Sequence, residues 1–194
     1  MDERPAVGLR GVVVPGVDGS ISFDLAAGDC VVLLDADSAR RTALLQVIAG
    51  VRPPTVGTVD AGGCAALWHD DAMPDDVPVV RTLAGRLRSF GASRGPRELL
   101  EGIGLAHRAG HEPWAMSLGE RRRIGLEAVF ASSAPVLVLD EPERGLDMAA
   151  LRWLRGRIRA ARHDGRVVLV ATHDAALAEA CGDFVIDDLD TLTE

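Results

Sequence analysis

Apolar and polar positions along the chain follow two different periods. Continuous apolar runs predict strands that are covered on both faces, because such strands turn no face to water. Apolar residues that recur every three or four positions predict helices between these runs. The predicted buried strands are residues 30–34, 135–139 and 166–171. The predicted helices are residues 38–49, with Gly50 as the C-cap, and residues 117–132, 147–162 and 175–180.

Shorter strands are expected towards the two ends of the chain. Residues 7–14 are apolar, residues 21–25 alternate with period two, and residues 184–186 form a last apolar run. Residues 56–68 predict two short strands around a Gly-Gly turn. Buried strands that alternate with helices indicate an α/β fold with a parallel sheet.

Residues 70–116 differ in composition from the rest of the chain. They carry acidic pairs, Pro and Gly, with helical stretches at residues 79–90 and 97–103. We interpret this segment as a helical insertion within a single domain that spans residues 1–194.

The composition narrows the class of protein. Of the 194 residues, 47% are hydrophobic, which excludes a disordered chain. All 21 basic residues are Arg against 29 acidic residues, and the net charge of −8 argues against nucleic acid as a partner. No apolar run is long enough to span a membrane, and the start shows no secretory signal. Cys30, Cys64 and Cys181 fit free thiols in a reducing compartment.

Two carboxylates follow a predicted buried strand. Asp140 and Glu141 come directly after four apolar residues, at the carboxyl end of a strand, where α/β proteins bind ligands. An Asp there can hold Mg²⁺, and a neighbouring Glu can orient an attacking water. By itself the pair fits equally well a strand that ends in a turn with two solvated acids.

Three further segments favour the chemical interpretation. They are Ser117, Leu118, Gly119 and Glu120 before the strand, Gly145, Leu146 and Asp147 after it, and His173 after the next apolar run. In this order and spacing, the chain resembles the ATP-binding subunit of ABC transporters over nearly its whole length. The resemblance implies the ABC ATPase fold: a P-loop NTPase-like parallel sheet, N-terminal antiparallel strands and a short helical subdomain.

The resemblance also assigns roles by position. Residues 117–120 match the family signature, except that Leu118 replaces a glycine, and the signature would face a γ-phosphate held by the opposite subunit. Residues 145–147 match the D-loop. Asp140 matches the Walker B aspartate, which would hold Mg²⁺ together with Thr42 if nucleotide binds. Glu141 matches the catalytic glutamate, and His173 matches the switch histidine.

The phosphate loop departs from the family pattern. The segment that matches the Walker A loop, G-x-x-x-x-G-K-[ST], is residues 35–42. Its nucleotide-binding positions are Asp35, Asp37, Ser38, Arg40, Arg41 and Thr42. Asp35 and Arg40 replace the two glycines, which otherwise let backbone N–H groups approach phosphate, and Arg41 replaces the lysine. Each added Asp repels a phosphate ~4 Å away by about 1–4 kcal/mol. We therefore expect weak or absent ATP binding.

The altered loop suggests another use for the same positions. Asp37 or Ser38 stands where a helix N-cap belongs, so its side chain would bind the N–H groups that otherwise hold phosphate. Arg41 would pair with Asp140 or Glu141. In this hypothesis the protein's own side chains fill the anion site.

Two other family features are altered. Residues 11–20 contain no aromatic residue to stack on adenine. His69 takes the place of the Q-loop glutamine. It could contact metal or water, or simply lie in a solvated loop.

The resemblance implies a cytosolic ATP-binding subunit on the inner face of the cell membrane, which uses ATP and Mg²⁺ and works with separate transmembrane permease subunits. Because the signature is kept while the phosphate loop is altered, the chain would complete the site of a second ABC ATPase chain, which favours a heterodimer over a homodimer. The alternative is a non-catalytic structural or regulatory subunit. A soluble ABC-type protein that acts on nucleic acid or ribosomes would need tandem domains or basic extensions, and the chain has neither.

Two groups of charged side chains are interpreted as solvated surface rather than as binding sites. Four arginines share one helix face, which favours a solvated face over a nucleic-acid stripe. They are Arg152, Arg155, Arg159 and Arg162. A second group, Asp70, Asp71, Asp75 and Asp76, lacks the spacing of a calcium loop and predicts a solvated loop.

Two further sets of residues each have two interpretations. His107 and His111 are four residues apart, but Gly110 and Pro113 interrupt a helix there, which predicts a loop rather than a metal site. Another set, Trp68, Leu83 and Phe90, fits either an interface with a membrane subunit or the core of the helical insertion.

Overall fold

The computed structural model describes residues 6–70 and 73–193. Its centre is a five-stranded parallel sheet with strand order β5-β6-β7-β3-β8. The strands are β3 (Cys30–Leu33), β5 (Cys64–Leu67), β6 (Val136–Asp140), β7 (Val167–Ala171) and β8 (Phe184–Ile186). All residues of β3, β6 and β7 are buried, as their continuous apolar runs predict.

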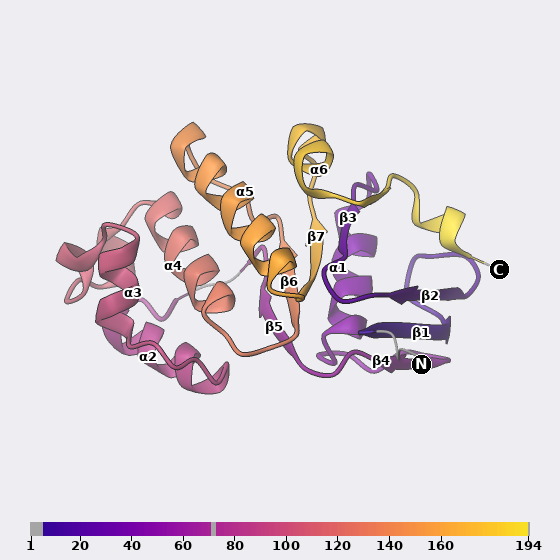
Figure 1. Ribbon diagram of the computed structural model, residues 1–194, viewed down its shortest axis with the longest axis horizontal. Coiled ribbons are helices and arrows are strands. Elements are labelled where there is room, and N and C mark those ends of the chain that lie inside the picture. Colours follow the sequence, from indigo (N-terminus) through magenta and orange to yellow (C-terminus); the bar gives the residue numbers. More distant parts are fainter. Residues whose placement is uncertain (1–5, 71–72, 194) are drawn as a thin grey trace.

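A second, antiparallel sheet has the order β2-β1-β4. Its strands are β1 (Val7–Val12), β2 (Ile21–Leu25) and β4 (Thr58–Asp60). Helix α1 (Ser38–Ile48) lies between the two sheets (Figure 1) and shares one hydrophobic cluster with both. The N-terminal antiparallel strands and the parallel sheet of the predicted fold class are therefore confirmed.

Helices α4 (Leu118–Phe130), α5 (Met148–His163) and α6 (Ala175–Cys181) cover the other face of the parallel sheet (Figure 1) and enclose a second cluster. The predicted helical stretches of residues 79–90 and 97–103 are α2 (Val79–Ser89) and α3 (Pro96–Gly102). Two 3-10 turns, η1 (Ala106–Arg108) and η2 (Pro113–Ala115), follow them. This part forms a third cluster with α4, at the end of the molecule away from the antiparallel sheet (Figure 1).

Several predicted boundaries shift by one or two residues. Strand β1 ends at Val12 rather than at residue 14, although Val14 is still buried. The cap of α1 is Ala49, and Gly50 follows it with φ +69°, where glycine avoids the clash of a Cβ atom. Helices α4 and α5 begin one residue later than predicted, because Ser117 and Asp147 are their N-caps. The 3-10 helix η3 (Leu189–Leu192) near the C-terminus was not predicted.

Trp68, Leu83 and Phe90 differ in burial and in the cluster they contact. Leu83 is 1% exposed inside the third cluster, and Phe90 packs partly buried against it. Trp68 packs against the first cluster. Leu83 is therefore a core residue of the helical insertion, Phe90 lies at the margin of that core, and Trp68 packs outside it. Within the described residues, no helix combines the length and apolarity that a bilayer crossing requires.

The register of the parallel sheet brings the residues of the candidate site to one edge. Leu33 and Asp140, the last residues of β3 and β6, both pair with Ala171, the last residue of β7. The segments that follow these three strands therefore meet at one edge of the sheet, where a parallel α/β fold places its ligands.

Candidate functional site

Asp140 lies at the centre of the candidate site. It is 1% exposed, and its Oδ2 accepts hydrogen bonds from the Thr42 hydroxyl at 2.9 Å and from the His69 backbone N–H at 3.4 Å. The Nδ1 atom of the His69 ring lies 2.8 Å from the same oxygen. Thr42 and His69, two positions singled out in the sequence, thus contact the carboxylate directly.

The backbone donors of the altered loop have partners within the chain. Asp37 is the N-cap of α1, and its side chain accepts hydrogen bonds from the N–H groups of Ala39, at 2.8 Å, and Arg40, at 3.4 Å. Asp35 accepts the N–H group of Asp37 at 2.8 Å. These contacts agree with the cap hypothesis, with Asp37 rather than Ser38 as the cap.

The loop also has a conformation that does not depend on glycine. None of residues 35–42 has a positive φ, and all of them are described. The backbone strain that non-glycine residues would carry in a glycine-type loop is therefore avoided, because the loop does not keep that shape.

Arg41 crosses the site from α1 to the end of β6. Its side chain is 3% exposed, its Nη1 donates to the Asp35 carbonyl, and its Nη2 lies 3.4 Å from Oε1 of Glu141. Of the two partners proposed for Arg41, the ion pair forms with Glu141. The guanidinium of Arg41 therefore contacts the carboxylate at the position of the catalytic glutamate.

Glu141 has an unusual backbone. Its φ of +48° is the only positive value of a non-glycine residue in the described part of the chain. Its N–H donates to the Ala171 carbonyl at 2.8 Å, which fixes it at the end of β7. Non-glycine residues rarely adopt this region, and such strain concentrates at functional sites.

Arg122 on α4 is a site residue that sequence reasoning missed. It is 6% exposed, and its guanidinium donates to the carbonyls of Trp68 at 2.7 Å, of Glu141 at 2.6 Å, and of Asp140. It ties the helix that begins with the signature to the ends of β5 and β6. In the sequence it is the middle of three consecutive arginines, and nothing there separates it from its neighbours.

Glu143 is a second missed residue. Its side chain is 8% exposed and accepts the Thr172 hydroxyl at 2.6 Å. Burial raises the pKa of Glu143, although the hydrogen bond from Thr172 and the nearby His173 ring act in the opposite direction. His173 is 69% exposed, with its Nδ1 3.5 Å from Glu143 and 3.9 Å from Glu141. The predicted switch histidine therefore faces two carboxylates.

The signature residues form a separate group at the start of α4. Ser117 and Glu120 make a capping box, in which each side chain accepts the other residue's N–H, at 3.1 and 2.9 Å. Arg108 adds an ion pair to Glu120 at 3.0 Å. Among the described residues, no hydrogen bond joins Ser117 or Glu120 to the cluster around Asp140.

The D-loop position packs on the signature. A Cβ atom on Gly119 would lie 2.5 Å from the Gly145 carbonyl oxygen, and one on Gly145 would lie 2.9 Å from the Leu118 side chain. Both positions therefore exclude larger residues, and Leu118 is still 48% exposed. Leu146 packs partly buried on the second cluster, and Asp147 accepts the Ala150 N–H at 2.7 Å as the cap of α5.

The arginine face on α5, which was predicted to be solvated, is solvated only in part. Arg152 and Arg159 are exposed, as predicted. Arg162, however, donates to the carbonyls of Gly28 and Cys181 and pairs with Asp183, and Arg155 donates to the Ala176 carbonyl at 3.4 Å. Half of the face therefore holds neighbouring elements together rather than being fully solvated.

The described residues of the remaining polar sets lie at exposed positions. His107 lies in η1 and His111 in the bend that follows it. Asp70, Asp75 and Asp76 are exposed, and Asp71 lies outside the described residues. In residues 6–70 and 73–193, no three His, Cys, Asp or Glu side chains gather as they would around a metal ion.

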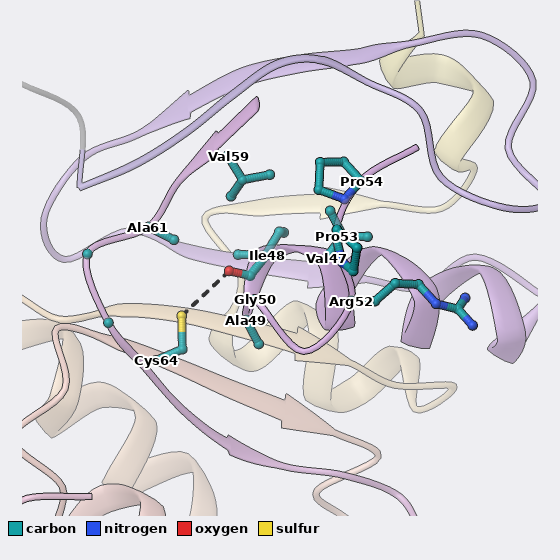
Figure 2. Close-up of a pocket in the computed structure, with 12 residues that line it drawn as sticks. Val47, Ile48, Ala49, Gly50, Arg52, Pro53, Pro54, Val59, Ala61 and Cys64 are labelled. Carbon is teal, nitrogen blue, oxygen red and sulfur yellow. Dashed lines mark hydrogen bonds between the residues drawn. The ribbon is translucent and has the colours of Figure 1, made fainter. Parts of the chain in front are cut away.

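A separate hollow of about 390 Å³ lies beyond the C-terminal end of α1 (Figure 2). Its wall is mainly apolar, with Val47, Pro53 and Val59 among its lining residues, and the Cys64 thiol donates to the Ile48 carbonyl at 3.7 Å there. Burial raises the pKa of Cys64 to about 11. None of the motif residues lines this hollow, so it is not part of the candidate site.

The chain is similar to a known protein family and to several named proteins. A family described as "AAA domain, putative AbiEii toxin, Type IV TA system" matches residues 66–179. The cytochrome c biogenesis ATP-binding export protein CcmA of Ruegeria pomeroyi is 31% identical over 162 residues, covering 82% of this chain and 78% of the relative. CcmA of Bradyrhizobium diazoefficiens is 31% identical, covering 87% and 91%.

Another relative carries a different name, and a solved structure shares the fold. The aliphatic sulfonates import ATP-binding protein SsuB 1 of Pseudomonas fluorescens is 32% identical, covering 88% of this chain and 66% of the relative. A solved ATP binding subunit of an ABC transporter superposes with a TM-score of 0.80 at 20% identity, covering 93% of this chain and 85% of that one. The chain therefore belongs to the AAA-domain family matched over residues 66–179 and, through its relatives, to the ATP-binding subunits of ABC transporters.

Proposed function

We propose that this chain is an ABC transporter subunit whose own nucleotide site is impaired, and that it completes the site of a partner ATPase beneath separate permease subunits. The observation that carries the proposal is the state of the former phosphate loop. Its N–H donors at Asp37, Ala39 and Arg40 are hydrogen-bonded to aspartates of the same loop. A phosphate would have to displace carboxylates that already satisfy these groups.

The group that the family implies, ATP with Mg²⁺, does not fit the residues present. The carboxylate oxygen of Asp140 that would serve Mg²⁺ already contacts Thr42 and His69. Arg41 donates to the Asp35 carbonyl and pairs with Glu141, so both of its Nη groups already have partners within the chain. We therefore derive no hydrolytic step at this site.

The signature end of the chain supports the second half of the proposal. Ser117 and Leu118 are exposed at the start of α4, where a helix N-terminus can meet an anion on another subunit. Since one chain's phosphate loop and the other chain's signature make each site of such a dimer, a signature remains useful without a working loop, although Leu118 replaces one of its glycines. This favours a heterodimer over a homodimer.

The permease subunits, rather than this chain, would determine the transported substrate. Relatives at 31% and 32% identity carry names that refer to cytochrome c biogenesis export and to sulfonate import. The ATP-binding subunit therefore does not by itself indicate a cargo or a direction. With permease subunits at the membrane, the chain would lie on the cytoplasmic face.

Calorimetry of the purified chain with Mg-ATP tests the impaired site. We expect no binding up to millimolar nucleotide, because a loss of several kcal/mol moves a micromolar site into that range. A matched variant restores the loop with Asp35→Gly, Ser38→Gly, Arg40→Gly and Arg41→Lys. Micromolar binding by the natural chain would overturn the proposal.

A second candidate function is local hydrolysis that uses Glu141. The strained backbone of Glu141, with φ +48°, and its closeness to His173 favour it. In cells that carry the transporter, Glu141→Gln separates the two functions. Loss of transport would indicate hydrolysis at this site, whereas unchanged transport would indicate a non-catalytic subunit.

A further inference from the structure

The two residues that replace the loop glycines contact each other and the C-terminal segment. Asp35 is 4% exposed, and its Oδ2 accepts the Leu189 N–H at 3.0 Å and lies 3.2 Å from Nη1 of Arg40. Nη2 of Arg40 lies 2.6 Å from Asp190 and 3.8 Å from Asp188. Arg40 therefore bridges three carboxylates from two distant parts of the chain.

The same cluster includes the loop between β1 and β2. The Asp18 N–H donates to the Asp190 carboxylate at 3.3 Å, and a Cβ atom on Gly16 would lie 3.3 Å from the Arg40 side chain. Three segments that are remote in sequence thus meet at the side chain of Arg40, which is only 17% exposed.

The C-terminal segment is further held by apolar packing and a short bridge. Leu189 is fully buried in the first hydrophobic cluster, and Leu192 packs partly buried against it. Thr193 forms an antiparallel bridge with Ile21 at the start of β2. The segment therefore runs from β8 across the start of α1 to the antiparallel sheet (Figure 1).

We propose that Asp35 and Arg40 form a clasp that straps residues 187–193 onto the former phosphate loop. The clasp is an autoinhibitory contact, since the loop cannot rearrange around an anion while Asp35 and Arg40 hold the strap. It gives the two substitutions a positive structural role: opposite charges at the former glycine positions stabilise the C-terminal segment.

Hydrogen exchange measured by mass spectrometry on the full chain tests the clasp. Arg40→Gln should raise the exchange rate of amides in residues 188–193 by about tenfold or more, because the strap then opens locally. The exposed Arg52, which makes no ion pair with described residues, provides the control Arg52→Gln, in which exchange should not change.

A double-variant comparison separates the clasp from a general loss of stability. Asp190→Asn should accelerate the same amides, and the double variant should exchange no faster than the faster single variant. Additive effects, or unchanged exchange in Arg40→Gln, would overturn the clasp. If Arg40→Gln does not fold, Asp190→Asn carries the test, because Asp190 is a surface residue.

The contact made by the clasp and the proposed function are tested separately. Micromolar Mg-ATP binding would overturn both the impaired site and the inhibitory role of the clasp. The exchange experiment contains no nucleotide, so the contact between Arg40 and the strap is tested by the exchange rates alone. Unchanged exchange would overturn the clasp and leave the impaired site standing.

Discussion

At the scale of single residues, the candidate site is defined by which polar groups already have partners. Asp37 caps α1, Arg41 pairs with Glu141, and Asp140 contacts Thr42 and His69. The cap could be predicted from local spacing, and the pair between Arg41 and one of two carboxylates from the positions of the motifs, although Glu141 lies 100 positions away. The partners of Asp35 could not, since Leu189 is 154 positions away.

Glu143 gives a pH-dependent prediction at this scale. Its folded-state pKa is raised by burial, so between the unfolded and folded pKa values the folded protein binds more protons than the unfolded one. The contribution of Glu143 to the free energy of unfolding therefore falls as pH rises through that window. The stability of Glu143→Gln relative to the natural protein should increase from pH 4.5 to pH 8, measured by thermal unfolding.

The exposed Glu101 offers a matched control for this experiment. Glu101→Gln should shift the midpoint equally at both pH values. A difference between Glu143→Gln and the natural protein that is constant with pH would contradict the prediction.

At the scale of elements, periodicity predicted the helices and strands well, because each buries one continuous set of apolar positions. It did not predict how α4 is fixed to the sheet. That connection depends on Arg122, which reaches carbonyls that follow β5 and β6. A guanidinium with several donors suits such a junction, where the ends of strands leave carbonyl oxygens without ladder partners.

Arg122→Gln tests this junction. Hydrogen bonds from a charged donor contribute about 1.5–3 kcal/mol each, and Arg122 donates to three carbonyls, so we expect the free energy of unfolding to fall by at least ~2 kcal/mol. Urea titration followed by circular dichroism measures it. Arg152→Gln, at an exposed position on α5, should change the value by less than about 0.5 kcal/mol. Equal effects of the two substitutions would show that Arg122 does not hold α4.

At the scale of the whole molecule, the accessibility of the three thiols depends on how the sheet and its helices pack. Cys30 and Cys181 are buried and Cys64 is half-buried, and all three are free. Burial raises the pKa of Cys30 to about 12 and that of Cys64 to about 11, from 9.0. The thiolate, which is the reactive form, is therefore scarce in the folded protein.

Labelling with a disulfide reagent at pH 8 should accordingly be slow until the protein unfolds. Because the pKa of Cys64 lies two units above 9.0, we expect its rate in the folded protein to be about 100-fold below that in urea. Burst labelling of one thiol in the folded protein would contradict this packing.

The clasp also makes a prediction for the whole molecule. In the variant with the restored Walker A sequence, Asp35 and Arg40 are lost together, so the C-terminal segment should lose its protection from hydrogen exchange whether or not Mg-ATP binds. A restored variant that keeps full protection of residues 188–193 would show that the strap is held by Leu189 and Thr193 alone.

The sequence by itself determined the strands, the helices, the order of the motifs and the absence of glycine from residues 35–42. These features depend on local spacing and on continuous apolar runs, which one stretch of chain carries within itself. Only the tertiary structure decided what the altered residues contact. Arg40 meets Asp190, Arg122 meets the carbonyls at the strand ends, and Glu143 meets Thr172, because folding brings together groups whose separation along the chain carries no signal.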